Sequence, residues 1–466
     1  MTEELWRRGA VELAGMIAEG SVSAREVVDA HLERIEAVNP HLNAIAVVLA
    51  EEARAAADAA DSNPGSGPLH GVPFTVKENI DVAGTATTSG IPALAEAIAP
   101  IDAPQVERLR AAGGIPIGRT NLPDFGLRIH TDSSLRGLTR NPWDPGVTAG
   151  GSSGGEASAL ASGMSPLGLG NDVGGSLRNP AHCCGIASIK PTPGRVPHAT
   201  VIPPEDHGPA MQFMNVEGVM ARRIADVRLG LGIVIGQHPR DPGSVPVPLD
   251  VPRPDGHRVA LLAEPPGGDT HPEVAAAVRR AGDVLSDAGY DVVEAVPPLY
   301  EDALRVWQTW LFADIQVQEP VLRQLMGADG QKFLDIAGAA VEPVSAADVF
   351  TAIAERRAIA RAWSAFLLEH PLILSPIWTQ PPFPHSFDIE SQAGGEATMS
   401  LMRPVEPANL LGLPAAAVPA GMAGGLPCGV QIMGERFQEL ACLEAAEVVE
   451  TTLGLATPVE VALAAA

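Results

Sequence analysis

Lysine is nearly missing from this chain of 466 residues. Only three of the 31 basic residues are lysines (Lys77, Lys190 and Lys332), and the other 28 are arginines. Arginine keeps its proton in proteins, whereas a buried lysine can lose it. Each lysine is therefore a candidate for a site that needs a neutral amine. The alternative is that the lysine lies on the surface by chance and has no functional role.

Positive charge is scarce as well, because the formal net charge is −25. Nucleic-acid binding needs a basic surface that displaces the counterions of the phosphates, so we expect no nucleic-acid partner. An acidic surface also disfavours anionic membranes and favours solubility. No apolar run approaches the ~18 residues of a membrane span, so we expect no membrane association.

Cysteine is rare, with four residues of which Cys183 and Cys184 are adjacent. Four cysteines are too few for a disulfide scaffold, and no Cys-x-x-Cys or Cys/His metal spacing occurs. We therefore expect neither a metal nor a cofactor. The first residues lack the apolar core of a signal peptide, so the sequence predicts a cytoplasmic protein.

Apolar patterns alternate between helix and strand along the chain. Residues 3–60 are typical of helices, with a capping box at Ser23 that opens a helix through Glu36. A buried strand at 72–76, which ends at Lys77, is followed by helical and strand patterns. The alternation predicts an α/β fold, a single large domain whose central twisted mixed β-sheet is flanked by helices on both faces.

Further elements are expected down to the C-terminus, with no internal repeat or clear domain break. They are a helix at 103–112, strands at 115–118, 259–262, 292–293 and 372–374, helices at 272–288 and 438–452, a mostly helical stretch at 300–366, strands and turns at 413–434, a loop at 61–68 and a proline-rich connection at 237–256.

Two glycine-flanked serines, Ser152 and Ser176, stand in the middle of the chain. Glycines around a serine let backbone N–H groups approach a reacting atom. A helix expected at 156–163 would direct the positive end of its dipole at the first cluster. The pattern around Ser152 matches the Gly-x-Ser-x-Gly nucleophile elbow, for which His182, His198 and His207 are candidate partners. However, no strand precedes Gly150, and the lysine of a phosphate-binding loop is absent.

Longer motifs carry a resemblance to a known family. Gly-Gly-Ser-Ser-Gly-Gly-Glu at 150–156, Gly-Leu-Gly-Asn-Asp-Val-Gly-Gly-Ser-Leu-Arg-Asn-Pro at 168–180 and Gly-Val-Pro-Phe-Thr-Val-Lys-Glu-Asn at 71–79 closely resemble the amidase signature family. Matches at 141–143, 190–192 and 425–431 extend the resemblance over nearly the whole chain. The resemblance implies the fold of that family and hydrolysis or transfer of the acyl group of carboxamides.

The resemblance also implies a Ser-cisSer-Lys triad. Ser176 would be the nucleophile, Lys77 the base and Ser152 the bridging serine, with a cis peptide bond between Gly151 and Ser152. The chemistry agrees, because a serine needs a base to become a nucleophile and burial lowers the pKa of a lysine. A hydroxyl can both donate and accept, so Ser152 can relay the proton.

The same motifs suggest groups around this triad. Backbone N–H groups of Val173, Gly174 and Gly175 would form the oxyanion hole. Asp172 and Arg178 would pair and hold that loop, together with Ser153. Since a lysine replaces histidine as the base, we expect structural or peripheral positions for His130, His182 and His198, a structural Lys190 and a surface Lys332.

Gly126, Leu127 and Ile129 are expected to contact the substrate in the acyl pocket, with Arg128 close by. The mouth is expected to be apolar, although each of its residues could equally belong to the core; they are Phe213, Met214 and Trp378, together with Met211, Trp307 and Trp310. Residues 203–214 and 300–366 would form this mouth. Few charges are expected there, so we favour apolar or aryl amides, anilides and carbamates.

The sequence thus predicts a serine hydrolase for small-molecule amides or carbamates, acting as a monomer or homodimer. Two alternatives stay open, namely an A-type amidotransferase subunit that needs a partner and a Ser-His-Asp esterase with Ser152 as nucleophile. Within the single domain 1–466 we expect N-terminal helices at 3–60, a catalytic core at 66–235, a variable substrate mouth at 236–400 and a return to the sheet at 401–466.

Overall fold

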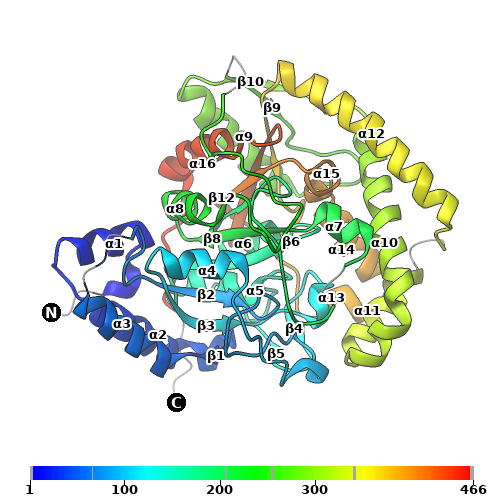
Figure 1. Ribbon diagram of the computed structural model, residues 1–466. Helices are drawn as coiled ribbons and strands as arrows, with labels where there is room; N and C mark the ends of the chain where they lie inside the picture. Colours follow the sequence, from blue (N-terminus) through cyan, green and yellow to red (C-terminus); the bar gives the residue numbers. More distant parts are fainter. Residues whose placement is uncertain are drawn as a thin grey trace.

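An 11-stranded mixed β-sheet runs through the whole computed structural model (Figure 1). The structure describes residues 4–63, 65, 67–204, 207–252, 257–339 and 343–461. Small parts of five predicted segments lie outside the described residues: the loop at 61–68, the mouth at 203–214, the connection at 237–256, the helical stretch at 300–366 and the two ends of the domain 1–466.

The strands follow the order β1-β3-β2-β6-β8-β7-β12-β13-β11-β9-β10. Neighbours β3, β2 and β6 are parallel, as are β11, β9 and β10, and the other neighbouring pairs are antiparallel. The strands are β1 (Ile45–Val48), β2 (Pro73–Lys77), β3 (Ile115–Thr120), β6 (Leu167–Asp172), β7 (Ala187–Lys190), β8 (Val216–Ala221), β9 (Arg258–Leu261), β10 (Asp291–Glu294), β11 (Leu372–Pro376), β12 (Ala415–Ala423) and β13 (Leu426–Gly434), with β4 (Asp132–Ser133) and β5 (Gly137–Leu138) forming a separate small ribbon.

Helices cover both faces of the sheet. They are α1 (Ala10–Ala18), α2 (Ala24–Leu42), α3 (Ala50–Ser62), α4 (Pro104–Ala111), α5 (Gly154–Ala161), α6 (Arg178–Cys184), α7 (Pro209–Met214), α8 (Ile224–Val234), α9 (Pro272–Asp287), α10 (Tyr300–Leu325), α11 (Ala328–Ala339), α12 (Ala346–Glu369), α13 (Phe387–Glu390), α14 (Gln392–Met402), α15 (Glu406–Leu411) and α16 (Glu439–Leu453). The predicted single α/β domain around a mixed sheet is confirmed.

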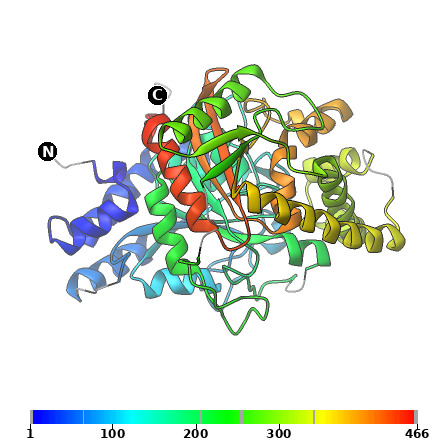
Figure 2. The ribbon, with the colours of Figure 1, turned by 90° about the horizontal axis from the view of Figure 1, so that it is seen from above.

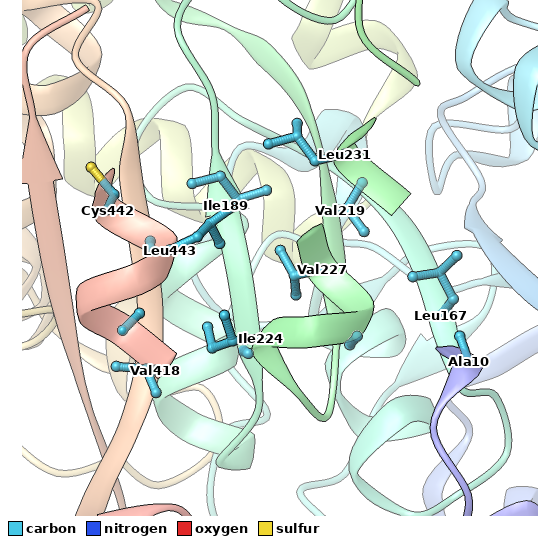
Figure 3. Close-up of a cluster of buried hydrophobic side chains, with 14 of the residues drawn as sticks. Ala10, Leu167, Ile189, Val219, Ile224, Val227, Leu231, Val418, Cys442 and Leu443 are labelled. Atoms are coloured by element: carbon cyan, nitrogen blue, oxygen red, sulfur yellow. The ribbon is translucent and has the colours of Figure 1, made fainter. Parts of the chain in front are cut away.

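The sheet is apolar on both sides, because successive strand residues point to opposite faces. On β8, Val219 packs in a core with α4, α8, α9 and α16, whereas Met220 packs in a second core with α5, α6, α10 and α15. Figure 2 shows α8 and α16 next to each other on one side of the sheet, and Figure 3 shows Leu231 of α8 and Leu443 of α16 close to Ile189 and Val219. Among the described residues, no helix combines the length and the apolarity that crossing a bilayer requires.

Three local predictions differ from the structure. Residues 3–60 are not all helical, because β1 pairs antiparallel with β3 and extends the sheet at its edge. The capping box at Ser23 is present, but the helix that it opens runs on to Leu42 and ends at Asn43, which adopts a left-handed conformation. Helix α5 begins at Gly154, inside the glycine cluster.

The topology brings the two predicted catalytic segments together. Strands β2 and β6 are parallel neighbours, so their carboxyl ends lie at the same edge of the sheet. Lys77 is the last residue of β2, and Asp172 ends β6 four residues before Ser176.

Candidate active site

Lys77 is fully buried and has two hydrogen-bond partners among the described residues. Its Nζ lies 2.8 Å from Ser152 Oγ and donates to Asn171 Oδ1 at 2.7 Å. An amide oxygen can only accept, so Asn171 engages one N–H of Lys77 and leaves the rest of the amine, which carries a lone pair when neutral, for the contact with Ser152. Asn171 was not among the predicted site residues, although it stands next to the end of β6, the strand beside that of Lys77.

Burial lowers the pKa of Lys77 well below that of an ordinary lysine. Desolvation lowers the pKa of Lys77 to about 7, against the opposing charges of Glu217, Asp172 and Glu156 in that order. An ammonium in water has its pKa near 10.4, so the protein interior makes the neutral amine available near neutral pH.

The loop that holds Ser152 is packed too closely for larger residues. The Gly151–Ser152 peptide bond is cis, as the resemblance implied. A Cβ on Gly151 would lie 2.6 Å from the carbonyl carbon of Ile129. Ser153 follows directly, and its N–H donates to the backbone oxygen of Ser176 at 3.3 Å. This contact joins the two serine loops.

Ser176 stands in a tight turn between β6 and α6. Asp172 organises this turn by accepting from the N–H groups of Gly175 (2.7 Å) and Leu177 (3.2 Å). Gly175 has a φ of +90°, and a Cβ there would meet Asn179 Oδ1 at 2.3 Å, so only glycine fits. The prediction that Gly175 contributes to the oxyanion hole disagrees with this geometry, because Asp172 already occupies its N–H.

Arg178 and Asp172 form a completely buried bidentate pair, with Nε–Oδ2 and Nη2–Oδ1 distances of 3.0 Å. Burial alone would raise the pKa of Asp172, but the charge and hydrogen bonds of Arg178, with help from Lys190 and Asn409, lower it to about 2. The expected pairing is thus present, and it fixes the shape of the turn around Ser176.

Breaking this pair should lower the free energy of unfolding of the protein. Arg178→Met leaves the Asp172 carboxylate buried and unpaired, which costs about 3–5 kcal/mol of unfolding free energy. Denaturant unfolding measures the loss. Arg279→Met is the control, because Arg279 pairs with Glu264 on the surface and should contribute about 1 kcal/mol or less. Equal, small losses for both variants would contradict the structural role of Arg178.

Two cavities meet at Ser176. One, of ≈ 120 Å³, also reaches Ser152 and Asn171 and has a partly polar wall with Asn79, Thr200 and His198. The other, of ≈ 60 Å³, is mostly apolar. Its lining includes Ile129, Trp307, Leu311, Phe312 and Met402.

The predicted substrate residues divide into two groups. Gly126, Leu127 and Ile129 line the cavities beside Ser176. Phe213, Met214 and Trp378 line neither. Phe213 is 52% exposed on α7, while Met214 and Trp378 are fully buried in the core, where Trp378 donates to Asn179 Oδ1.

Trp307 and Met211, two other residues expected at the mouth, do line the apolar cavity. Trp307 comes from α10 and donates from Nε1 to the backbone oxygen of Val173 at 3.2 Å. Trp310, also expected at the mouth, lines neither cavity and is buried in the core. Core and pocket positions look alike in a helical pattern. Arg128 also lines the apolar cavity, but Asp388 binds it at 2.8 and 2.9 Å, so its charge is neutralised.

In the part of the chain that the structure describes, neither a histidine nor another lysine is hydrogen-bonded to the side chains of Lys77 and Ser152. His130 and His182 are fully buried, and burial lowers the pKa of both. His198 lines the polar cavity, which fits its expected peripheral position. Lys190 is buried and donates to the Pro191 carbonyl, and Lys332 is exposed, as predicted.

A sequence profile of known amidases matches residues 26–443. The chain belongs to the amidase family. Indoleacetamide hydrolase of Bradyrhizobium diazoefficiens is 42% identical over 463 residues, which cover 97% of this amidase and 87% of the relative. The A subunit of glutamyl-tRNA(Gln) amidotransferase from Synechococcus sp. (strain WH7803) is 33% identical over 471 residues, or 92% and 94% of the two chains.

Solved structures agree with this assignment. The structure of 6-aminohexanoate cyclic dimer hydrolase in complex with its substrate superposes on the amidase with a TM-score of 0.83 at 29% identity, covering 97% of this chain and 98% of the other. The predicted family, fold and amidase activity on C–N bonds are therefore confirmed.

Proposed function

We propose that this amidase hydrolyses aryl-substituted carboxamides through an acyl-enzyme on Ser176. The observation that carries the proposal is the buried Lys77–Ser152 contact of 2.8 Å beside a cavity that also contains Ser176. A neutral lysine held next to a hydroxyl is a base for a serine nucleophile. No histidine takes part in the described contacts of Ser152, which argues against the esterase alternative with Ser152 as nucleophile.

The reaction would proceed in two halves. Ser176 Oγ attacks the amide carbonyl while its proton passes to Ser152 Oγ and the proton of Ser152 passes to Lys77 Nζ. The relay then runs backwards, so that the leaving nitrogen receives a proton and the C–N bond breaks. In the second half, water attacks the acyl-enzyme, the same relay takes its proton, and Ser176 regains its hydrogen as the acid departs.

Backbone donors would stabilise the tetrahedral intermediates. With Gly175 engaged by Asp172, the N–H groups of Val173, Gly174 and Ser176 make no hydrogen bond to any described residue and are available for the oxyanion. Each such donor is worth roughly 3–4 kcal/mol of barrier in acyl-transfer sites. Trp307 buttresses this loop, because a Cβ on Gly174 would lie 2.7 Å from its ring.

The apolar cavity supports this substrate class. Its walls are aromatic and aliphatic, and the buried Arg128–Asp388 pair adds no net charge, so an aryl acyl group fits better than a charged one. The similarity to indoleacetamide hydrolase supports an arylacetamide. A glutamine amide, as in the amidotransferase alternative, would bring an ammonium and a carboxylate into a cavity whose Arg128 and Asp388 already bind each other.

A substrate panel tests this assignment. We expect kcat/KM to fall in the order arylacetamide, anilide, short aliphatic amide and glutamine, with an aryl carbamate included to measure the carbamate activity. Phe312→Ala should raise KM for the arylacetamide roughly ten- to hundredfold, because covering an aromatic ring contributes about 1.5–3 kcal/mol. The short aliphatic amide serves as the control and should change little. A preference for glutamine would overturn the proposal.

A further inference from the structure

A buried carboxylate stands one side chain away from Lys77. Glu217 of β8 pairs directly with Asn171 of β6, so the two side chains share a face of the sheet at about 5 Å between their Cβ atoms. Asn171 in turn accepts from Lys77. Glu217 is 1% exposed, and its Oε2 makes no hydrogen bond with the described residues.

His198 covers the other oxygen of this carboxylate. Its Nδ1 lies 2.8 Å from Glu217 Oε1, and its backbone N–H donates to Asp241 at 2.9 Å. The His198 side chain is 35% exposed and lines the cavity of Ser152 and Ser176, with the ring of His207 at 5.6 Å. The pair therefore connects the reaction cavity to the interior beside Lys77.

Three carboxylates oppose the loss of the proton from Lys77, and Glu217 has the largest influence, ahead of Asp172 and Glu156. Asp172 is neutralised by Arg178, which never loses its charge. Glu156 is bound by the hydroxyls of Thr75 and Thr120, and burial raises the pKa of its own carboxyl to about 7. Of the three carboxylates, Glu217 is the one whose charged partner, His198, can itself gain or lose a proton near neutral pH.

That partner is easier to protonate than an ordinary histidine. Burial disfavours the imidazolium of His198 and would lower its pKa. The hydrogen bond and charge of Glu217, together with the charges of Asp241 and Asp81, outweigh burial and raise the pKa of His198. When His198 is charged, it cancels much of the field of Glu217; when it is neutral, that field acts on Lys77 in full.

We propose that Glu217 and His198 form a positioning pair that controls how readily Lys77 holds its proton. Neither residue takes part in the triad or in the oxyanion hole. The pair acts through charge on the base, and its catalytic consequence rests on the proposed role of Lys77.

Substitutions of the two residues should move the titration midpoint of Lys77, the pH at which half of it is protonated, in opposite directions. Glu217→Gln removes the negative charge, so this midpoint should fall by roughly one pH unit. His198→Asn keeps a donor near the position of Nδ1 but removes the positive charge, so the same midpoint should rise. Glu217→Asp keeps the charge and should leave the midpoint close to that of the unmodified protein. A merely structural role would not produce opposite signs.

The scarcity of lysine makes the measurement direct. Lysine labelled with carbon-13 at Cε gives three side-chain resonances in the whole protein, and Lys77→Met identifies that of Lys77. Lys190 is an internal control, because it is buried, its pKa is lowered to about 7 by desolvation, and the charges that influence it do not include Glu217. An unchanged Lys190 resonance also shows that a variant is folded.

The outcomes separate this inference from the proposed function. Opposite shifts of the Lys77 titration midpoint in Glu217→Gln and His198→Asn support the inference. Shifts of the same sign, or no shift, overturn it. Glu294→Gln, an exposed residue on the far edge strand, removes an equal charge and should leave Lys77 unchanged. The titration midpoint of Lys77 could shift as expected in the variants while the acidic limb of their kcat/KM profile stays at the same pH. In that case Glu217 and His198 do control the protonation of Lys77, but Lys77 is not the catalytic base.

Discussion

Ser176→Ala abolishes amide hydrolysis, with an expected fall in kcat of at least about 10⁴-fold, because the enzyme loses the oxygen that attacks the amide carbonyl and carries the acyl group. The fold should persist, since the described contacts of Ser176 are made by its backbone oxygen. Steady-state kinetics on an arylacetamide measures the first effect, and circular dichroism with thermal unfolding measures the second. Substantial turnover by a folded variant would disprove the role of Ser176.

A covalent probe distinguishes the two serines independently of mutation. A sulfonyl or phosphonyl fluoride should label Ser176 in the intact protein, and peptide mass spectrometry should find Ser152 unmodified. An adduct on Ser152 would instead support the nucleophile elbow.

Ser165→Ala is a matched control for Ser176→Ala, since Ser165 is buried but its hydroxyl only donates to the Leu167 carbonyl.

Lys77→Met should lower kcat/KM about 10²–10⁴-fold at neutral pH, which is the range that general bases contribute. The unmodified enzyme needs Lys77 neutral, and its pKa is about 7. Activity should therefore rise as the pH increases through about 7 and fall below it, and the variant should lose this limb from its pH profile.

The control for Lys77 is another lysine. Lys332 is exposed on α11, so Lys332→Met should keep both the rate and the acidic limb. An esterase triad would predict the opposite of our expectation, namely that Lys77→Met stays active with a limb set by a histidine. A pH profile of the two variants thus decides between a lysine and a histidine base.

Much of the fold follows from local patterns. The strand that ends at Lys77 is continuous and apolar because both of its faces are covered, and this signal survives in the sequence alone. Strand β1 gave no such signal, since four residues at a sheet edge, only partly buried, look like the neighbouring alanine-rich helices. Strand order was also beyond prediction, because β6 lies next to β8 and β7 next to β12 through contacts distant in the sequence.

The site shows the same division. Glycine clusters and a rare lysine are chemical signals that a sequence displays directly, so Lys77, Ser152 and Ser176 could be proposed without coordinates. Trp378 and Met214 were misjudged as pocket residues because an apolar side chain has the same pattern in a core and in a pocket. Asn171 and Glu217 were missed because their importance comes from facing each other across two strands.

The burial of two of the three lysines has a practical consequence for attaching this protein to a surface. Amine-reactive supports usually couple a protein through many lysines and in many orientations. Here Lys332 on α11 is the one exposed lysine side chain among the described residues. Coupling through it, with the N-terminal amine blocked, would tether every molecule at the same helix and in nearly one orientation.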